Sequence, residues 1–332
     1  MFSIGAPARC ACSVFEFGKL NGFTAIEGDD KKACAALKKL NARERRGFGE
    51  LFVLEDSATS ERLQRAAVAV ESLPDDSVRA VEQKSAAFEQ LQHNYDFEKA
   101  TDLANLWCAA FVIRKRMADG QLVLAPVAQS TANDTKPAAT QTGLFGEMFQ
   151  QPTGKSKTPA KVTAQPSGLA EAIGITSGHL RDFAKGAALP DGLMNEARQL
   201  TGQYRFFHWH LAFPEVFKRN GFDVILGNPP WENTELKEKE FFAERRPDIA
   251  NASTGSKRKA FIDALVRQDP QLHSEFVAAL REREGIAHVL GNSGLYPLCG
   301  RGRINLFAVF AERMHQLRPI SGRAGAVLPG GI

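Results

Sequence analysis

Four consecutive residues in the second half of the chain have the types needed for chemistry on a flat amine: Asn228, Pro229, Pro230 and Trp231. The two prolines fix φ near −65° twice and bias each preceding residue away from the α region, so we expect a rigid turn. Asn228 offers a side-chain carbonyl and Pro229 keeps its backbone carbonyl, which gives the turn two hydrogen-bond acceptors. Trp231 adds a flat apolar face on which a nucleic-acid base can stack, a contact worth about 1–3 kcal/mol.

This arrangement favours methyl transfer to an exocyclic amine such as adenine N6. The lone pair of an aromatic amino group is delocalised into the ring, which makes the nitrogen a poor nucleophile. Two acceptors that hold the two amino hydrogens localise the lone pair and aim it at a sulfonium methyl group, by positioning and fixed electrostatics. Such a reaction requires no general base at its start, and we expect no metal.

The segment before the turn predicts the strand that positions it. Val224–Leu226 is a short apolar run between Gly221 and Gly227, a pattern typical of a central parallel strand covered on both faces. Ligands bind at the carboxyl ends of such strands. We expect Gly227 to support the turn, and Asp223 or Glu215 to shape it from behind.

The segment after the turn predicts the rest of one crossover unit. A long polar stretch up to residue 303 is followed by a helix with Asn305 at its N-cap. Its apolar residues recur at spacings of three and four, as in a helix that faces a core. Arg318-Pro319 is expected to end this helix, and Ala324–Leu328 to form a second strand. Strand, polar insertion, helix and strand together predict a parallel pair of strands.

These segments resemble the adenine-specific methylase domain of large type IIG restriction-modification and phage-defence enzymes. The resemblance extends over residues 204–332, and before them only Ala104–Phe111 is similar. It is carried by Phe207–Trp209, Phe213–Phe217, Gly221–Trp231, Tyr296–Gly302, Asn305–Phe310 and Gly322–Pro329. It implies an α/β fold class: part of a Rossmann-like S-adenosylmethionine-dependent methyltransferase fold. The implied substrate is an adenine flipped out of double-stranded DNA. A similar turn also serves methylation of glutamine side chains and ribosomal RNA bases.

A cofactor-binding loop is missing from the pattern. S-adenosylmethionine binding in this fold uses a strand followed by a glycine-rich turn, because the backbone must approach the cofactor closely. Gly47-Phe48-Gly49 follows a charged run, and Gly300-Arg301-Gly302 lacks a preceding strand, so no cofactor-binding residues are assigned. We therefore expect a truncated or split methylase whose cofactor half and target recognition come from a separate chain. The alternative is a non-catalytic nucleic-acid-binding or assembly protein of the same fold.

Composition divides the chain into three parts. Residues 1–127 predict a mainly helical interaction or spacer region. Residues 128–168 are rich in Ser, Thr, Gln, Pro, Gly and Lys, which predicts a flexible linker. Within it, Leu144–Phe149 is a small apolar island, a candidate docking motif or a packing segment. Residues 169–332 predict a partial methyltransferase catalytic domain.

Charge and cysteine content are compatible with DNA binding in a reducing compartment. The net charge is +4, which permits nucleic-acid binding without selecting it. Candidate phosphate contacts are basic residues that could equally lie on a solvated helical face: Lys257, Arg258, Lys259, Arg301 and Arg303. Five scattered cysteines, including the pair Cys10 and Cys12, argue against a disulfide framework.

Two further patterns bear on location and on metals. No run of eighteen apolar residues is present and the N-terminus lacks a leader pattern, so we expect a cytoplasmic protein. His208 and His210 have strand spacing, but no carboxylate or cysteine completes a site nearby. We expect packed or surface roles for both, and not metal ligation.

Overall fold

The computed structural model describes residues 20–46, 57–118, 172–190 and 192–330. The predicted linker at 128–168, its apolar island, Cys10 and Cys12, and the Gly47–Gly49 stretch lie outside these residues. The described residues up to 117 and from 172 onwards fall in one compact unit.

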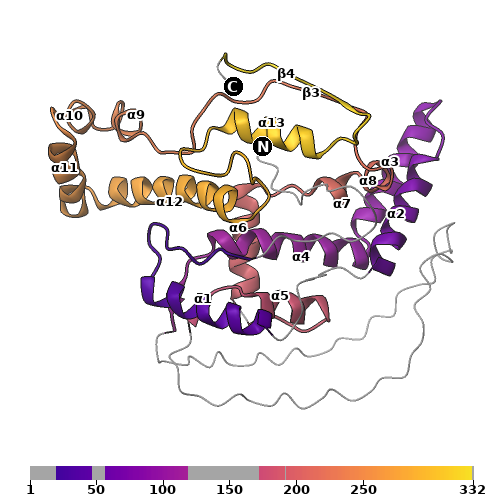
Figure 1. The fold of residues 1–332 in the computed structure, drawn as a ribbon, viewed down its shortest axis with the longest axis horizontal. Coiled ribbons are helices and arrows are strands. Elements are labelled where there is room, and N and C mark those ends of the chain that lie inside the picture. The colour runs from indigo at the N-terminus through magenta and orange to yellow at the C-terminus, as the bar shows by residue number, and fades with distance from the viewer. Residues whose placement is uncertain (1–19, 47–56, 119–171, 191, 331–332) are drawn as a thin grey trace, which may run out of the picture. The chain divides into compact units, whose positions relative to one another are not determined.

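The described part of the chain is largely helical (Figure 1). The first helices are α1 (Lys31–Arg46), α2 (Ser57–Glu71), α3 (Val78–Gln92) and α4 (Tyr95–Val112), followed by β1 (Arg116–Met117). After the gap come β2 (Ala172–Ile173), α5 (Ser177–Ala184), α6 (Leu193–Tyr204), α7 (Trp209–Ala212), α8 (Pro214–Lys218) and β3 (Val224–Gly227). The last elements are α9 (Glu238–Phe242), α10 (Pro247–Ala250), α11 (Gly255–Gln268), α12 (Pro270–Asn292), α13 (Leu306–Gln316) and β4 (Arg323–Ala326).

Helix α4 is the centre of the core. Its side chains are buried without interruption from Leu106 to Val112, and Ala104, Ala109 and Ala110 have no exposed surface. The small side chains allow neighbouring helices to approach closely, and α4 contacts α5, α6 and α12. The described parts of the N-terminal and C-terminal regions therefore pack against each other through this helix.

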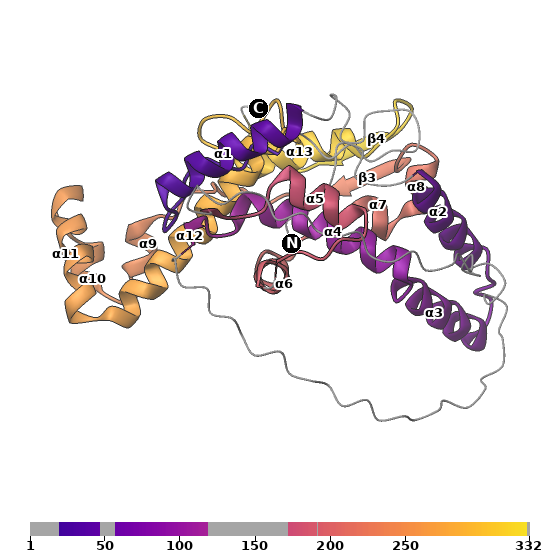
Figure 2. The same cartoon turned by 90° about the horizontal axis from the view of Figure 1, so that it is seen from below.

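Helices α2 and α3 form a hairpin beside α4 (Figure 2). Ser77 begins α3 by accepting a hydrogen bond from Ala80 N, and Asn94 begins α4 by accepting one from Asp96 N. These caps satisfy backbone donors that a helix start leaves unpaired. The chain reverses direction between α2 and α3, which pack against each other.

A buried charged group joins the start of the described chain to α12. The Asp29 side chain has no exposed surface, and its Oδ1 accepts from Arg281 Nη1 at 2.9 Å and from Lys115 N at 3.2 Å. Lys115 Nζ lies 3.8 Å from Asp29 Oδ2 and donates to Phe111 O and Ile113 O. Burial lowers the pKa of Lys115 to about 8, although Asp29 opposes this shift.

The polar segment after the turn forms a small helical module with its own apolar core. Helices α9, α10 and α11 and the first part of α12 enclose buried side chains: Phe242, Ile249, Ala250, Ile262, Leu265, Leu272 and Phe276. Thr254 caps α11 and Asp269 caps α12 through side-chain oxygens. This segment is thus a folded insertion between β3 and α13.

The sheet content differs from the sequence-based expectation. Among the described residues, β1 pairs antiparallel with β2, and β3 pairs in parallel with β4, so each sheet has two strands. The parallel pair confirms the predicted crossover unit, and α13 follows Asn305 as expected. The described residues do not show the large Rossmann-like sheet. The expectation that Val224–Leu226 is covered on both faces is wrong, since Val224 is 60% and Leu226 80% exposed.

Candidate active site at the end of strand β3

Strand β3 is held in place by the end of α13 and by β4. Phe222 N donates to Leu317 O at 2.9 Å, and Gly221, whose φ is +119°, makes the close approach to Leu317 possible. Arg323 N then donates to Asp223 O at 2.8 Å, and Val327 N to Gly227 O at 3.2 Å. These two hydrogen bonds lie at the two ends of the parallel pairing and fix where the following turn begins.

The Asn-Pro-Pro-Trp turn lies at the carboxyl end of β3, as the sequence predicts. Pro229 is buried, while Asn228 and Pro230 are exposed. Trp231 is 58% exposed, and its indole Nε1 donates to Val327 O at 3.4 Å. A buried proline thus fixes the turn, while Asn228 and the ring of Trp231 remain accessible to a ligand.

The residues after the turn are anchored to the loop before α13. Asn233 and Asn305 form an antiparallel bridge, Leu306 N donates to Glu232 O at 2.9 Å, and Thr234 N donates to Ile304 O at 3.2 Å. These bonds tie the turn to the start of α13. The turn is therefore fixed from both sides, by β3 before it and by this pairing after it.

The loop before α13 is itself held by a buried carboxylate. Glu312 is 7% exposed and accepts from Leu298 N at 3.1 Å and from Cys299 N at 2.9 Å. Burial, together with the Glu312 charge, raises the pKa of the Cys299 thiol. Sequence reasoning did not identify Glu312, because a single acidic residue on an amphipathic helix looks like a solvent-exposed position.

An aromatic cluster packs before β3. Trp209 stacks on Phe213 with ring centroids 5.8 Å apart, and Phe222 meets Trp209 and Phe213 edge to face at 5.6 and 5.3 Å. Edge-to-face pairs of this kind contribute about 0.5–1.5 kcal/mol beyond the area they bury. The aromatic residues that precede β3 thus pack against Phe222 at the start of the strand.

His208 and His210 are packed inside the protein and do not follow strand geometry. His208 is the N-cap of α7 and His210 lies within it, and they are 7% and 3% exposed. His208 Nε2 lies 2.8 Å from Asn105 Oδ1. Burial lowers the pKa of His208 to about 4 and that of His210 well below its ordinary value. No group of three potential metal ligands is found in the part of the chain that the structure describes.

The supporting carboxylates lie at the opposite end of β3 from the turn. Asp223 directly precedes the strand and is exposed, and Glu215 lies in α8, before it. Asn228 lies five residue steps after Asp223 along the strand, or about 16 Å at roughly 3.3 Å per step. The expectation that they shape the turn from behind therefore does not fit the geometry. Gly227 faces α13, since a Cβ there would lie 3.6 Å from Met314 Cε.

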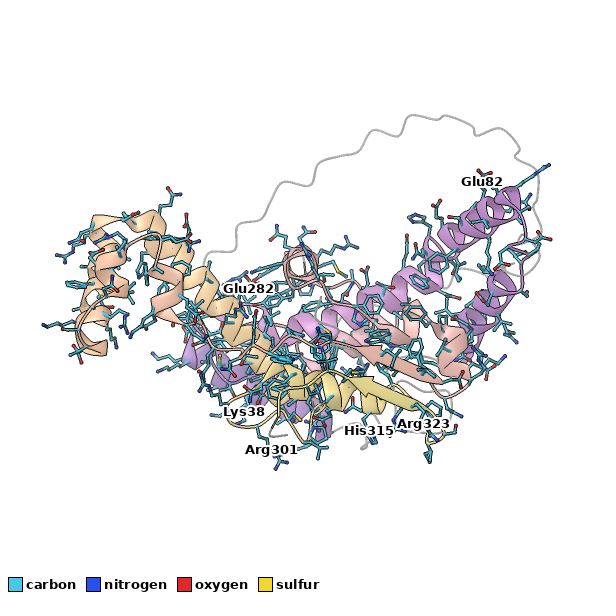
Figure 3. The ribbon with its side chains drawn as sticks, turned by 90° about the horizontal axis from the view of Figure 1, so that it is seen from above. Lys38, Glu82, Glu282, Arg301, His315 and Arg323 are labelled. Carbon is cyan, nitrogen blue, oxygen red and sulfur yellow. The ribbon has the colours of Figure 1, made fainter. Side chains whose placement is uncertain are left out.

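The candidate phosphate-binding residues separate into two groups. Lys257, Lys259 and Arg301 are exposed, and so is Arg303, which lies 3.2 Å from Glu235. Figure 3 labels Arg301, in the loop before α13. The prediction for Arg258 does not fit, because the residue is 9% exposed, its Nε donates to Ile249 O at 3.3 Å, and its Nη1 lies 3.6 Å from Glu238. Arg258 therefore stabilises the helical module by joining α11 to α10 and α9.

The described Gly-x-Gly segment, residues 300–302, does not have the setting of a cofactor-binding loop. Gly300 and Gly302 lie in the loop before α13, with no strand directly ahead of them, as the sequence indicated. Strand β3 leads into two prolines instead of a glycine-rich turn. The described geometry therefore fits the amine side of a methyl transfer, and it assigns no residue to S-adenosylmethionine binding.

A comparison with known protein families matches the stretch of the chain that contains the turn. No helix in the described ranges is long and apolar enough to span a membrane. No curated protein and no solved structure matches the chain. Residues 139–265, which include β3 and the turn, match the family model of the Eco57I restriction-modification methylase. This stretch of the chain is thus similar to a restriction-modification methylase.

Proposed function

We propose that this chain is the amine-positioning part of an S-adenosylmethionine-dependent DNA methyltransferase that acts on adenine N6 in a restriction-modification or phage-defence system. The observation that carries the proposal is the turn at the end of β3. It leaves Asn228 and Trp231 exposed while Pro229 is buried. The match of residues 139–265 to a restriction-modification methylase supports the same reaction class.

Each residue of the turn has a distinct proposed role. The Asn228 side-chain oxygen and the Pro229 carbonyl accept the two amino hydrogens of the base. Pro230 keeps the turn rigid, and Trp231 stacks on the adenine ring after the base leaves the duplex. The hydrogen bond from Trp231 Nε1 to Val327 O fixes the plane of the indole ring beside the carboxyl end of β4.

The proposed partner in solution is double-stranded DNA. Exposed Lys257, Lys259, Arg301 and Arg303 are the proposed phosphate contacts. Such contacts position the duplex and carry no sequence information. The second candidate function is a non-catalytic DNA-binding or assembly protein of the same fold, which the same exposed basic residues would also serve.

Base stacking on Trp231 tests the proposal without requiring catalysis. The intrinsic tryptophan fluorescence of the chain is titrated with duplex DNA that carries one mismatched adenine, and with the same duplex fully paired. We expect quenching with a clear preference for the mismatched duplex, since extruding an unpaired base costs less. Trp231→Phe should abolish the quenching, because Trp107 is 2% exposed and Trp209 is packed among aromatic rings.

Asn228→Ala separates the two candidate functions. If the turn grips the amino group, this variant should lose the preference for adenine over purine, which lacks the amino group, while keeping its affinity for the duplex. Equal quenching of the wild type by adenine and purine at the mismatch would contradict the proposed function. That result would favour the DNA-binding alternative.

A further inference from the structure

Helix α1 carries a much higher density of positive charge than the chain as a whole. Seven of its sixteen residues are basic and one, Glu44, is acidic, which gives the helix a net charge of +6. The whole chain carries +4, so all the residues outside α1 together carry −2. Positive charge is thus concentrated on this one helix.

The basic residues lie together on one side of α1. The buried residues Ala33, Cys34, Leu37 and Asn41 form the other side of the helix. At 3.6 residues per turn, six basic residues fall within an arc of about 140° roughly opposite to them. All six are exposed, and we call them the basic face of α1: Lys31, Lys32, Lys38, Lys39, Arg43 and Arg46. Figure 3 labels one of them, Lys38.

Contacts on the buried side hold α1 in place and leave the basic face without a carboxylate partner. Glu44 Oε2 accepts from Gly178 N in α5 at 2.8 Å, so the one acidic side chain of the helix is turned away from the basic face. Asn41 donates from Nδ2 to Leu20 O at 3.1 Å and accepts at Oδ1 from Ser177 N at 2.7 Å. In the described ranges, no residue of the basic face forms an ion pair.

The basic face opposes the stability of its own helix. Lys31 and Lys32 lie in the first turn, which contains no acidic residue and where the helix macrodipole disfavours cations. Lys39 and Arg43 are like charges four residues apart, which also destabilises a helix. Helix stability therefore does not explain this arrangement. A bound polyanion would relieve the repulsion among the six cations.

The chemistry of α1 favours the phosphate backbone of a duplex over other polyanions. The helix has no aromatic side chain, whereas proteins that bind single strands stack the bases on aromatic rings. Its apolar side packs against α5, β1 and β2, so it is not available for the insertion that anchors interfacial helices in membranes. From Lys31 to Arg46 the helix rises by about 22 Å, a length over which a DNA duplex presents about 13 phosphates.

We propose that the basic face of α1 binds the phosphate backbone of duplex DNA without regard to sequence. Contacts from lysine and arginine to phosphates hold and orient a duplex but do not read its bases. This surface holds the chain on DNA independently of the turn after β3. The inference rests on the proposed function only for the choice of DNA among duplex nucleic acids, because the charge and the placement of α1 do not depend on methyl transfer.

The test measures how the affinity for a fluorescein-labelled DNA duplex of random sequence depends on salt, by fluorescence anisotropy on the whole chain. The first variant combines Lys32→Gln, Lys39→Gln and Arg43→Gln. Each phosphate contact contributes about 0.9 to the slope of log affinity against log salt. We therefore expect the slope of this variant to fall by between about 0.9 and 2.7 relative to the wild type.

A control variant removes the same charge from dispersed positions. It combines three substitutions at exposed residues of α2, α3 and α8: Arg65→Gln, Arg79→Gln and Lys218→Gln. Exposed charges separated by more than a Debye length of about 8–10 Å act on a ligand only weakly. The control should therefore keep the slope of the wild type.

Urea denaturation of both variants checks the argument about helix stability. The first variant should have a urea midpoint equal to or above that of the wild type, because it removes Lys32 from the first turn and the repulsion between Lys39 and Arg43. A lower midpoint would show that these side chains stabilise α1. That result would remove the reason for assigning them to a partner.

Two results of the binding assay would overturn the proposal: no binding of the wild type to the duplex at low salt, and equal falls in slope in both variants. Vesicles that contain phosphatidylserine serve as a second probe. If the first variant loses binding to these vesicles but keeps the wild-type slope on DNA, the face belongs to a membrane surface instead. A reduced slope together with equal quenching by adenine and purine at the mismatch would contradict the proposed function alone. An unchanged slope with the adenine preference retained would contradict the basic face alone.

Discussion

Gly221→Ala is the substitution whose effect on stability the structure predicts most sharply. Gly221 has a φ of +119°, and a Cβ there would lie 2.2 Å from Leu317 O and 3.0 Å from Leu317 C. The same oxygen accepts the hydrogen bond from Phe222 N that begins the strand. An alanine side chain must therefore displace the end of α13 or break this bond.

Two effects lower the free energy of unfolding, and a third partly offsets them. An unfavourable backbone conformation costs about 1–3 kcal/mol, and loss of the hydrogen bond costs about 1 kcal/mol more. The smaller conformational entropy of the unfolded alanine chain offsets about 0.4–1 kcal/mol. The sum is a loss of about 1–3.5 kcal/mol in the free energy of unfolding.

Gly186→Ala is the matched control. Gly186 has a φ of +91°, and a Cβ there would meet nothing within 4 Å. It should thus carry the backbone strain without the collision. Urea denaturation followed by circular dichroism gives both free energies of unfolding. If Gly221→Ala is no more destabilising than Gly186→Ala, the close contact between Gly221 and Leu317 does not hold β3 in place, and the reasoning fails.

Three further predictions concern buried charges and DNA contacts. The pKa of Lys115 is lowered to about 8 in the folded chain from its ordinary 10.5, so between these pH values the unfolded chain binds one more proton than the folded chain. The free energy of unfolding should therefore rise as pH increases from 8 to 10. The urea midpoint of Lys115→Met should rise less over this range, and an equal rise in both proteins would refute the assignment. Burial lowers the pKa of His288 to about 4, so this side chain must take up a proton when the chain unfolds between pH 6.5 and 4, and the thermal midpoint should fall over that range. At pH 5, His288→Leu should take up about one proton fewer on unfolding than the wild type. Unchanged proton uptake would contradict this assignment. Arg258→Met should destabilise the helical module in urea denaturation. Lys259→Met should leave stability unchanged, and filter binding at several salt concentrations should show that it reduces the slope of log affinity against log salt by up to about 0.9. A loss of stability in Lys259→Met together with a reduced slope in Arg258→Met would contradict these roles.

Local sequence patterns predicted the elements around the turn well. The apolar run before the two prolines specified a strand, and the spacing of apolar residues after Asn305 specified α13, because these signals depend on neighbouring residues alone. Their parallel pairing followed from the order strand, helix, strand. The position of the turn at the carboxyl end of β3 followed in the same way.

What failed depended on distant contacts. An apolar run shows that a strand can be buried, but it does not supply the elements that cover it, and Val224 and Leu226 remain exposed among the described residues. Arg258 looked like its neighbours Lys257 and Lys259, yet helical periodicity turns it toward Ile249 and Glu238. Glu312 was missed because its partners, the amides of Leu298 and Cys299, are brought to it by a loop.

Methyl transfer is the most direct test of the central claim that the turn from Asn228 to Trp231 presents an amine for methylation. The chain is incubated, alone and together with the polypeptide encoded upstream of it, with duplex DNA and S-adenosylmethionine labelled in the methyl group, and the modified nucleoside is identified by mass spectrometry. We expect N6-methyladenine with the wild-type chain, and at least a hundredfold less with Asn228→Ala at unchanged DNA affinity. Methylation that persists in Asn228→Ala, or that appears on a different base atom, would contradict it.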